Sequence, residues 1–309
     1  MLQAARATDR VDVVAVASRD RMRAEEYARE HGLERWHGSY ESLLADTAVE
    51  AVYISLPNSL HVEWSARALR AGKHVLCEKS LDPRAAEVER LHDLAAERSL
   101  ILMEAFMYRH HPRTRLLEDL VRGGSIGTLR AVRATFSAML DAPGDIRFVP
   151  ELGGGALLDV GCYCVHGTRL LAGEPERVFA EQVVGPTGVD LRFVGTMRFP
   201  GDVLAQFDCG LDLPGRSGLE AVGSGGSIYV PEPWGSGDPV VEVRRPGGVE
   251  RITAETADAY QRELENMRDA IEGKAPPLLG RDDALGQART LQALLQSAQL
   301  GRPVSVPAT

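Results

Sequence analysis

The alternation of strand and helix patterns in the first third of the chain is the feature that most restricts its fold. Four short apolar runs rich in β-branched residues are separated by stretches with helical periodicity. These runs lie at residues 11–17, 51–56, 74–77 and 100–105. Parallel strands need long crossover connections, and helices usually supply them. The pattern therefore predicts an α/β domain built on a parallel sheet.

The rest of the chain has a different pattern, in which β-type segments follow one another closely. From residue 129 to residue 253 these segments are separated only by turns rich in Gly and Pro. Helical periodicity returns in 260–271 and again near the end of the chain. We therefore predict an α+β domain with an antiparallel sheet at residues 124–309, after a first domain at residues 1–123. The last helix is a candidate to return to the first domain.

Charge and cysteine content exclude several classes of function. The chain has 309 residues, of which 35 are basic and 44 acidic, so its net charge is −9. Nucleic acid and anionic membranes are therefore poor candidate partners. No apolar run approaches the roughly 18 residues of a membrane-spanning helix. The four cysteines show neither a CxxC motif nor the Cys/His spacing of zinc sites, so we predict no metal site and a cytoplasmic location.

One element of a nucleotide-binding βαβ fold is absent from the start of the sequence. Such a fold opens with a strand and a Gly-x-Gly-x-x-Gly turn, whose backbone N–H groups hold a pyrophosphate. Residues 1–8 instead look like the end of the helix that would follow this turn. We thus predict a Rossmann-like, doubly wound sheet without its first strand, and we expect coding sequence to continue in frame upstream of Met1.

Three motifs resemble the glucose–fructose oxidoreductase / inositol dehydrogenase (Gfo/Idh/MocA) family. They are AGKHVLCEKS at 71–80, MEAFMYRHHPR at 103–113 and GGGALLDVGCY at 153–163, and their order and spacing are typical of the family. The family's Glu-Lys-Pro reads Glu78-Lys79-Ser80 here. The resemblance is closest to the branch of sugar dehydrogenases, dihydrodiol dehydrogenases and nucleotide-sugar ketoreductases.

The resemblance implies an oxidoreductase that uses NADP, with NAD as the alternative cofactor. Its substrate would be a sugar-like polyol, in which a secondary alcohol and ketone, or an aldose and lactone, are interconverted. The resemblance also implies a homodimer or homotetramer that packs through an open face of the antiparallel sheet. Two other functions stay open: an activity of the trans-dihydrodiol dehydrogenase type, and a non-catalytic protein that binds a cofactor or ligand.

Lys79, Asp159 and Tyr163 are the predicted catalytic residues. Lys79 follows a buried strand at its carboxyl end, where α/β sheets place ligands, and its ammonium would stabilise charge on a reacting oxygen. Asp159 and Tyr163 are four residues apart, which puts them on one helix face. In the family branch this sequence resembles, a Tyr stands at the second of these positions. We expect Tyr163 to act as general acid/base and Lys79 to lower its pKa, while Asp159 orients the substrate or the lysine. In the alternative interpretation these residues have no catalytic role: Lys79 is a loop lysine paired with Glu78, and Tyr163 is a core residue.

Residues that follow three of the predicted strands are candidates for the cofactor site. They are Ser18, Arg19, Leu56, Pro57, Asn58, His61, Glu78 and Lys79. Arg19 would hold a 2′-phosphate through two hydrogen bonds and Ser18 would add another, which favours NADP. Asp20 is interpreted as the N-cap of the next helix. In the alternative, Asp20 binds the ribose, and Asn58 and His61 belong to a turn and a helix start.

Arg109, Arg147 and His166 are the candidates for contacts with substrate oxygens. His166 continues the helix face that carries Asp159 and Tyr163. Surface salt bridges are an equally good explanation of the two arginines.

Overall fold

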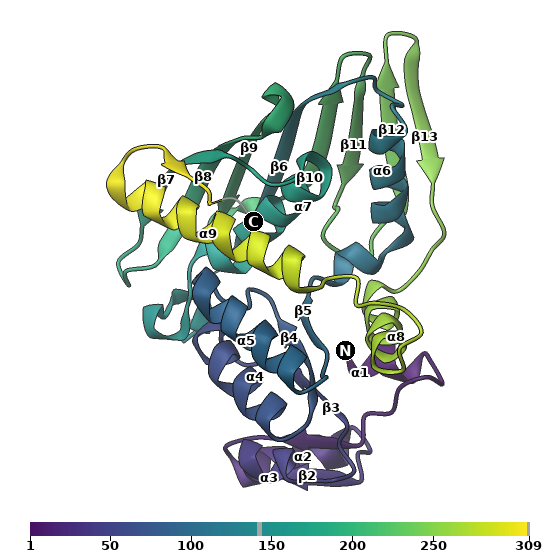
Figure 1. Ribbon diagram of the computed structural model, residues 1–309, viewed down its shortest axis with the longest axis vertical. Helices are drawn as coiled ribbons and strands as arrows, with labels where there is room; N and C mark the ends of the chain where they lie inside the picture. Colours follow the sequence, from purple (N-terminus) through teal and green to yellow (C-terminus); the bar gives the residue numbers. More distant parts are fainter. Residues whose placement is uncertain (141–143, 308–309) are drawn as a thin grey trace.

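A parallel βα arrangement forms the first part of the chain (Figure 1). The computed structural model describes residues 1–140 and 144–307. The predicted strands are present. β1, β3 and β5 are shorter than their apolar runs, and β4 extends one residue beyond its run. β2, which is largely polar, is an additional strand. The elements of this part are α1 (Leu2–Arg6), β1 (Ala15–Ala17), α2 (Arg21–Glu30), β2 (Arg35–His37), α3 (Tyr40–Leu44), β3 (Ala51–Ile54), α4 (His61–Arg70), β4 (His74–Glu78), α5 (Ala85–Glu97) and β5 (Leu102–Ala105).

A nine-stranded sheet, with four more helices, forms the rest of the molecule. Its strand order is β13-β12-β11-β10-β6-β9-β8-β7-β14. The elements are α6 (Pro112–Arg122), β6 (Leu129–Met139), α7 (Cys162–Ala172), β7 (Arg177–Val184), β8 (Asp190–Arg198), β9 (Leu204–Gly210), β10 (Asp212–Gly223), β11 (Ser227–Pro231), β12 (Val240–Arg245), β13 (Gly248–Thr253), α8 (Ala259–Ile271), α9 (Arg281–Leu300) and β14 (Val304–Ser305). The predicted antiparallel sheet has one exception, because β6 and β9 run parallel. The chain passes through α7, β7 and β8 between these two strands, and this long connection lets it return in the same direction.

The parallel sheet of the first part is divided in two. β1 pairs only with β2, whereas β3, β4 and β5 form a separate three-stranded sheet. A groove of about 880 Å³ lies between the two sheets. Its lining includes residues 10–17, which contain β1, and residues 48–56, which contain β3. Within residues 1–140 and 144–307 no strand joins the two sheets. The fold is therefore the Rossmann-like one that the sequence predicts, without its first strand.

Both faces of the three-stranded sheet are covered, which explains why most residues of its strands are apolar. On β4, Val75 and Cys77 pack in one cluster with the buried residues of α4 and α5. Leu76, between them in sequence, belongs to the other cluster together with Leu264 and Met267 of α8. Successive side chains of a strand point to opposite faces, so each layer takes every second residue of β4.

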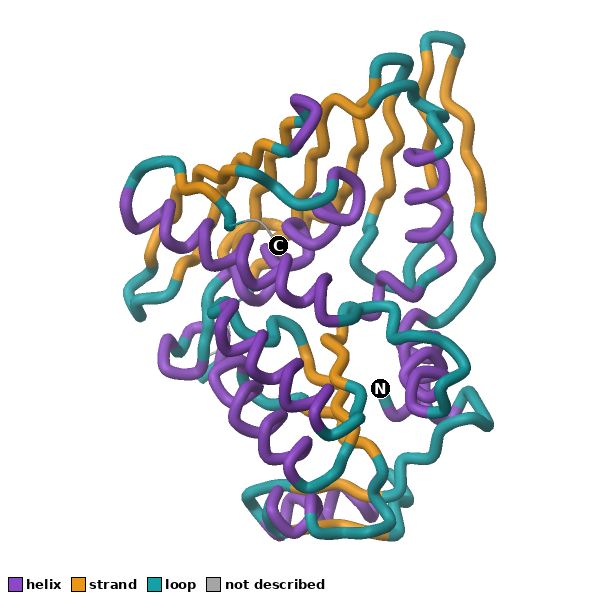
Figure 2. The backbone as a smooth tube through the Cα atoms, viewed as in Figure 1, coloured by secondary structure: helices purple, strands orange, loops and turns teal. Residues whose placement is uncertain are grey.

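The nine-stranded sheet, in contrast, has one covered face and one open face. Helices α7 and α9 pack on the covered face (Figure 2). Along β8, Phe193 and Met197 are buried, whereas Val194 and Thr196 between them are exposed. This alternation is typical of a sheet that faces a core on one side only.

Helix α9 packs against both parts of the molecule. Ala284, Leu285 and Ala288 lie in the cluster of α4 and α5, while Leu291 and Leu294 lie in the cluster of the nine-stranded sheet. Helix α6, which precedes the predicted domain boundary, contacts β11 and β12 of the nine-stranded sheet. The division of the chain into two domains at residue 123 stays a prediction. None of the helices described is both long and hydrophobic enough to cross a lipid bilayer.

Candidate active site

Lys79 directly follows β4, and its ammonium lies against a residue far away in the sequence. The Nζ atom is 3.0 Å from Oδ1 and 2.6 Å from the main-chain oxygen of Asp159. The same Nζ lies 5.2 Å from the ring centroid of Tyr163. The fold thus brings the three predicted catalytic residues together. Glu78, the alternative partner of Lys79, instead accepts hydrogen bonds from the Tyr53 hydroxyl and from the backbone N–H of Lys79.

Asp159 is shared between two cations. Its Oδ2 atom is 2.9 Å from Nε of Arg147, whose Nη1 also donates to Asp145 at 2.9 Å. The exposed fraction of the side chain rises from 14% for Lys79 to 21% for Asp159 and 43% for Arg147. Lys79, Asp159 and Arg147 thus form a row of charged groups, in which Lys79 is the most buried and Arg147 the most exposed.

Lys79 keeps its charge in spite of its surroundings. Burial alone would lower the pKa of Lys79. The neighbouring Cys162 and Asp159, together with the hydrogen bond to Asp159, outweigh burial and hold the pKa of Lys79 above its ordinary value. A fixed positive charge therefore stands at the carboxyl end of β4.

Asp159 and Tyr163 come from two consecutive helical segments. Asp159 lies in a π-helical turn, η5 (Leu157–Gly161), which continues into α7. Its main-chain oxygen accepts from Lys79 Nζ and also from Cys162 Sγ at 3.5 Å. Single π-turns are rare and occur frequently at functional sites.

Tyr163 stands inside a cluster of aromatic rings. The rings of Phe106, Tyr108, Phe136 and Trp234 have their centroids 5.4–6.0 Å from that of Tyr163. Its hydroxyl lies 4.0 Å from the sulfur of Met107. The site therefore surrounds the phenol with apolar and aromatic groups.

The net pKa shift of Tyr163 is opposite to the lowering that was expected from Lys79. Burial raises the pKa of Tyr163 well above its ordinary value. Lys79 does not reverse this shift, because its Nζ lies over the face of the ring and is bound to Asp159. At neutral pH Tyr163 is consequently a protonated phenol, a group suited to donate a proton.

The segment that follows β1 leaves the Arg19 side chain exposed. Asp20 accepts hydrogen bonds from the backbone N–H groups of Met22 and Arg23, so it is the N-cap of α2 as predicted. Ser18 lies beside it and accepts from the backbone N–H of Asp20 at 3.1 Å. The Arg19 side chain is exposed, and within the described residues it has no ion-pair partner. A free guanidinium next to a hydroxyl is the arrangement that suits a phosphate.

Two residues after β3 connect this strand to neighbouring loops. Leu56 and Pro57 lead into the 3₁₀ turn η1 (Asn58–Leu60). Asn58 donates from Nδ2 to the main-chain oxygen of Gly153 at 2.9 Å. Gly153 has φ of 75°, and a Cβ there would lie 2.9 Å from Cβ of Asn58, so this close approach requires glycine.

His61 does not face a ligand, in contrast to the sequence prediction. It is fully buried, and its two ring nitrogens lie 2.8 Å from the main-chain oxygens of Ser80 and Leu56. His61 therefore ties the loop after β3 to the loop after β4. Its effect on a cofactor would be exerted through Leu56 and Lys79-Ser80.

Arg109 and His166 also differ from their predicted role, because both are bound to Asp283 of α9. His166 Nε2 lies 2.9 Å from Oδ2 of Asp283, and Arg109 Nη1 lies 3.6 Å from Oδ1. His166 has no exposed surface, so it cannot touch a substrate in this structure. The prediction considered only the helix face that His166 shares with Tyr163, and the partner that buries His166 comes from a segment distant in sequence. Only Arg147 of the three predicted substrate contacts reaches the Lys79–Asp159 pair.

Sequence reasoning missed several residues around the site. Phe106, Trp234 and Asp283 come from three distant segments, and no local spacing indicates that they meet. Glu104 is a further case: its Oε1 accepts from the backbone N–H of Leu81 at 2.8 Å, and burial raises its pKa to about 8. Glu104 and Phe106 lie within the motif MEAFMYRHHPR, and this is the only sequence signal that could have pointed to them. In the part of the chain that the structure describes, no group of three or more His, Cys, Asp or Glu side chains is arranged to hold a metal ion.

Comparison with known proteins gives a consistent result over most of the chain. A model of an oxidoreductase family with an NAD-binding Rossmann fold (GFO/IDH/MocA) matches residues 1–106, and the GFO/IDH/MocA C-terminal domain matches residues 114–229. D-xylose 1-dehydrogenase (NADP(+)) 2 of Haloferax volcanii is 36% identical, over 96% of this chain and 92% of the relative. A dTDP-3,4-didehydro-2,6-dideoxy-alpha-D-glucose 3-reductase of Streptomyces violaceoruber is 38% identical, over 97% and 92%.

A solved structure shares nearly the whole fold. It is a 3-ketoreductase from Actinomadura kijaniata in complex with NADP and TDP-benzene, with a TM-score of 0.90, 34% identity, and coverage of 96% of this chain and 92% of that one. Variants of that enzyme at one lysine and at one tyrosine have also been crystallised with the same two ligands. The separation of that lysine and tyrosine along their chain equals the separation of Lys79 and Tyr163 here.

Proposed function

The chain belongs to the GFO/IDH/MocA family of oxidoreductases, and from that premise we propose that it transfers a hydride between NADP and a sugar-like substrate. The substrate pair is a secondary alcohol and its ketone, or an aldose and its lactone. The observation that carries the proposal is the ammonium of Lys79, which is held by Asp159 over the ring of Tyr163 at the carboxyl end of β4. Relatives named for xylose and for a dTDP-deoxysugar support the sugar-like class.

Each catalytic residue has a separate task in this proposal. NADP, when bound, supplies or takes up the hydride at its nicotinamide. In the direction of reduction, Tyr163 donates its hydroxyl proton to the carbonyl oxygen of the substrate. Lys79 stabilises the negative charge that develops on that oxygen, and Asp159 fixes the position of the ammonium. Since burial raises the pKa of Tyr163, the phenol is in the protonated form that reduction requires at neutral pH.

The choice of NADP follows from the residues after β1. Asp20 uses Oδ1 of its carboxylate to cap α2, which gives this residue a structural role besides any contact with a ribose. Arg19 remains exposed, with Ser18 beside it, and this pair would hold a 2′-phosphate. Leu56, Pro57, Asn58 and Glu78 would line the rest of the cofactor site at the ends of β3 and β4.

Two measurements test the proposal. A fluorescence titration with NADPH, run in parallel with NADH, should show tighter binding of NADPH. Tyr163→Phe should lose roughly 10²- to 10⁴-fold in turnover, the range typical of a lost general acid, on sugars or keto-sugars that the wild type reduces or oxidises. The affinity of this variant for NADPH and its melting temperature should stay unchanged. The lost hydroxyl contacts only the sulfur of Met107, at 4.0 Å, and a thioether is a weak acceptor. Undiminished turnover would reject the role of Tyr163, and equal affinity for both cofactors would reject that of Arg19.

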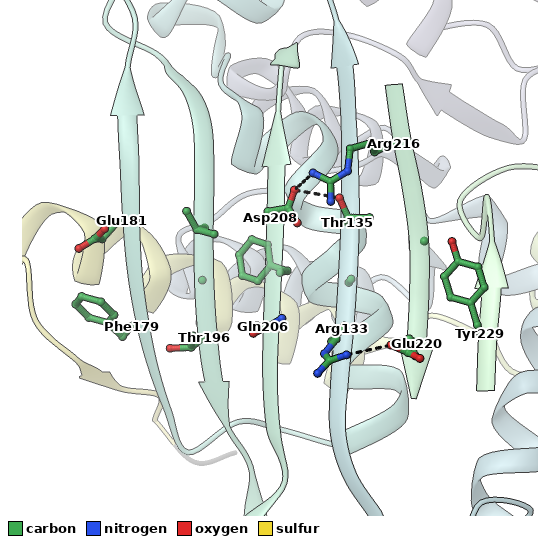
Figure 3. Close-up of a pocket in the computed structure, with 15 residues that line it drawn as sticks. Arg133, Thr135, Phe179, Glu181, Thr196, Gln206, Asp208, Arg216, Glu220 and Tyr229 are labelled. Carbon is green, nitrogen blue, oxygen red and sulfur yellow. Dashed lines mark hydrogen bonds and ion pairs between the residues drawn. The ribbon is translucent and has the colours of Figure 1, made fainter. Parts of the chain in front are cut away.

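We also propose that two copies associate through the open face of the nine-stranded sheet, in the cytoplasm. This face has a hollow of about 460 Å³ (Figure 3), and apolar Val194 lies exposed among its residues. The Arg133–Glu220 and Arg216–Asp208 pairs flank the hollow. Replacing Val194 by Arg places a charge in the proposed interface, so sedimentation should detect smaller particles than for the wild type. A cytoplasmic location agrees with the free thiols of Cys77, Cys162, Cys164 and Cys209.

A further inference from the structure

A buried chain of hydrogen bonds lies behind Tyr163 and has no part in the steps above. Oδ2 of Asp283 is 2.9 Å from Nε2 of His166, and Nδ1 of His166 is 2.6 Å from the hydroxyl of Tyr108. The Asp283 carboxylate can only accept, so Nε2 carries the proton, and Nδ1 accepts from the Tyr108 hydroxyl. Burial also lowers the pKa of His166 to about 4, which keeps the ring neutral. The chain joins α9, α7 and the 3₁₀ turn η2 (Met107–His110).

This Asp–His–Tyr arrangement has the form of a nucleophile triad, but its burial excludes that role. His166 and Tyr108 have no exposed surface, so neither can touch a substrate. Any effect on the reaction must therefore pass through the residues that they contact.

Those contacts lead to Tyr163. The segment Phe106–Tyr108 packs against one side of the Tyr163 side chain, and we call this segment the wall of Tyr163. The rings of Phe106 and Tyr163 meet edge to face with centroids 5.4 Å apart, and the sulfur of Met107 lies 4.0 Å from the Tyr163 hydroxyl. The Tyr108 ring is 5.9 Å away.

His166 holds this wall at both ends. Its ring stacks on Phe106 at 4.1 Å with an interplanar angle of 9°, and its Nδ1 accepts from Tyr108. Tyr163 and His166 lie on the same helix, α7, so the tyrosine and the residue that braces its wall cannot move independently.

We propose that His166 is a positioning residue for the reaction: it holds the segment Phe106–Tyr108 against Tyr163 and thereby fixes where the phenol hydroxyl lies. The inference rests on the proposed role of Tyr163 as proton donor. A donor must be held within hydrogen-bond reach of the substrate oxygen, and a displacement of about 1 Å is enough to cost roughly 100-fold in rate.

Two variants remove the brace without emptying the site. Tyr108→Phe deletes only the hydroxyl that donates to His166, and His166→Phe keeps a ring against Phe106 but removes both hydrogen bonds. His92→Phe is the matched control, because His92 is a buried histidine on α5 whose Nε2 has no hydrogen-bond partner among the described residues.

The expected result is a loss in kcat without a loss in binding. Tyr108→Phe and His166→Phe should each lower kcat by roughly 10- to 100-fold, while KM and the affinity for NADPH change less than about twofold. The double variant should be no slower than His166→Phe alone, since both changes break the same bond. The control should keep the wild-type kcat.

The pH profile gives a readout that loss of stability alone would not move. If the wall loosens, water reaches Tyr163, burial raises its pKa less, and reduction should fail at lower pH than in the wild type. This alkaline limb should move in both variants and stay in place in the control. The titratable or charged groups whose fields act on Tyr163 and His166 are Lys79, Glu78, Asp159, Cys162, Tyr260, Asp283, Arg109 and Arg169, and all of them are unchanged in these variants.

The outcomes separate the inference from the proposed function. If Tyr163→Phe keeps its turnover, the proposed function fails and the inference falls with it. If Tyr163→Phe loses turnover while Tyr108→Phe and His166→Phe keep the wild-type kcat and pH profile, only the inference is overturned. An equal loss in His92→Phe would also overturn it, because the effect would then belong to core packing in general.

Discussion

Exchanging Lys79 for Met tests whether this residue acts on the substrate or only supports Asp159. The structure offers a matched comparison, because two cations bind the same carboxylate. Lys79 Nζ is 3.0 Å from Oδ1 of Asp159, and Arg147 Nε is 2.9 Å from Oδ2. Lys79→Met and Arg147→Met each remove one of these cations and leave the other in place. A lysine with only a structural role would therefore behave like the arginine.

The expected magnitudes differ for activity and for stability. Removing one group that stabilises a developing oxyanion costs roughly 10²- to 10³-fold in kcat, or about 2.7–4 kcal/mol. Breaking a fully buried ion pair costs about 3–5 kcal/mol of stability, because the remaining charge has no partner. Here Asp159 keeps Arg147, and 21% of its side chain is exposed to water. We therefore expect Lys79→Met to lose only about 1 kcal/mol of unfolding free energy.

Initial rates at saturating substrate and NADPH, followed by the absorbance of NADPH, give kcat for both variants. Urea denaturation gives their unfolding free energies. Lys79→Met should lose kcat and keep most of its stability, whereas Arg147→Met, whose guanidinium lies at the outer end of the row, should keep kcat within a few-fold and mainly raise KM. A wild-type kcat in Lys79→Met, or the same loss of kcat in both variants, would refute the assignment.

Three further predictions follow from contacts described above. Arg19→Ala should weaken NADPH by roughly tenfold or more and leave NADH unchanged in parallel titrations, because the charge-assisted bonds to the 2′-phosphate are lost. His61→Ala should lower the unfolding free energy in urea by about 1–3 kcal/mol, since the ring donates to the main-chain oxygen of Leu56 or of Ser80 and that oxygen loses its buried donor; a loss below about 0.5 kcal/mol would contradict this. Burial raises the pKa of Glu104 from 4.5 to about 8, so the folded protein retains a proton that the unfolded chain releases, and this group makes stability fall as pH rises from 4.5 to 8. Glu104→Gln should flatten that fall in urea titrations across the same pH range, and an unchanged slope would argue against the buried, protonated carboxyl.

The sequence allowed the fold class to be predicted because periodicity is a local property. The runs around β3, β4 and β5 are mostly apolar, since each of these strands is covered on both faces. Their type is therefore evident without any knowledge of their neighbours. β2 escaped because its residues, Arg35 to His37, are only partly buried and polar or aromatic. The parallel pairing of β6 with β9 escaped for another reason: strand order depends on contacts between distant residues, which no short window contains.

The site was predictable only where one motif or one helix contained the answer. Lys79, Asp159 and Tyr163 were found from local motifs, and the structure places them together. The direction of the Tyr163 pKa shift was not predictable, because it depends on the position of an ammonium relative to a ring and on burial by four distant aromatic residues. The role of His166 was misjudged because its partner Asp283 comes from α9, a distant segment that no local spacing relates to His166.

The location of Asp283 links the last helix to the chemistry. A buried carboxylate is costly unless it is paired, and Asp283 faces Arg109, Arg169 and His166 at the same time. Burial alone would raise the pKa of Asp283, but these three groups hold it well below its ordinary value, so the carboxylate stays ionised. An ionised Asp283 fixes the tautomer of His166 and so leaves Nδ1 as the acceptor for Tyr108. Because α9 packs against both parts of the molecule, a shift of this helix would displace the group that sets the tautomer, and the wall of Tyr163 would shift with it.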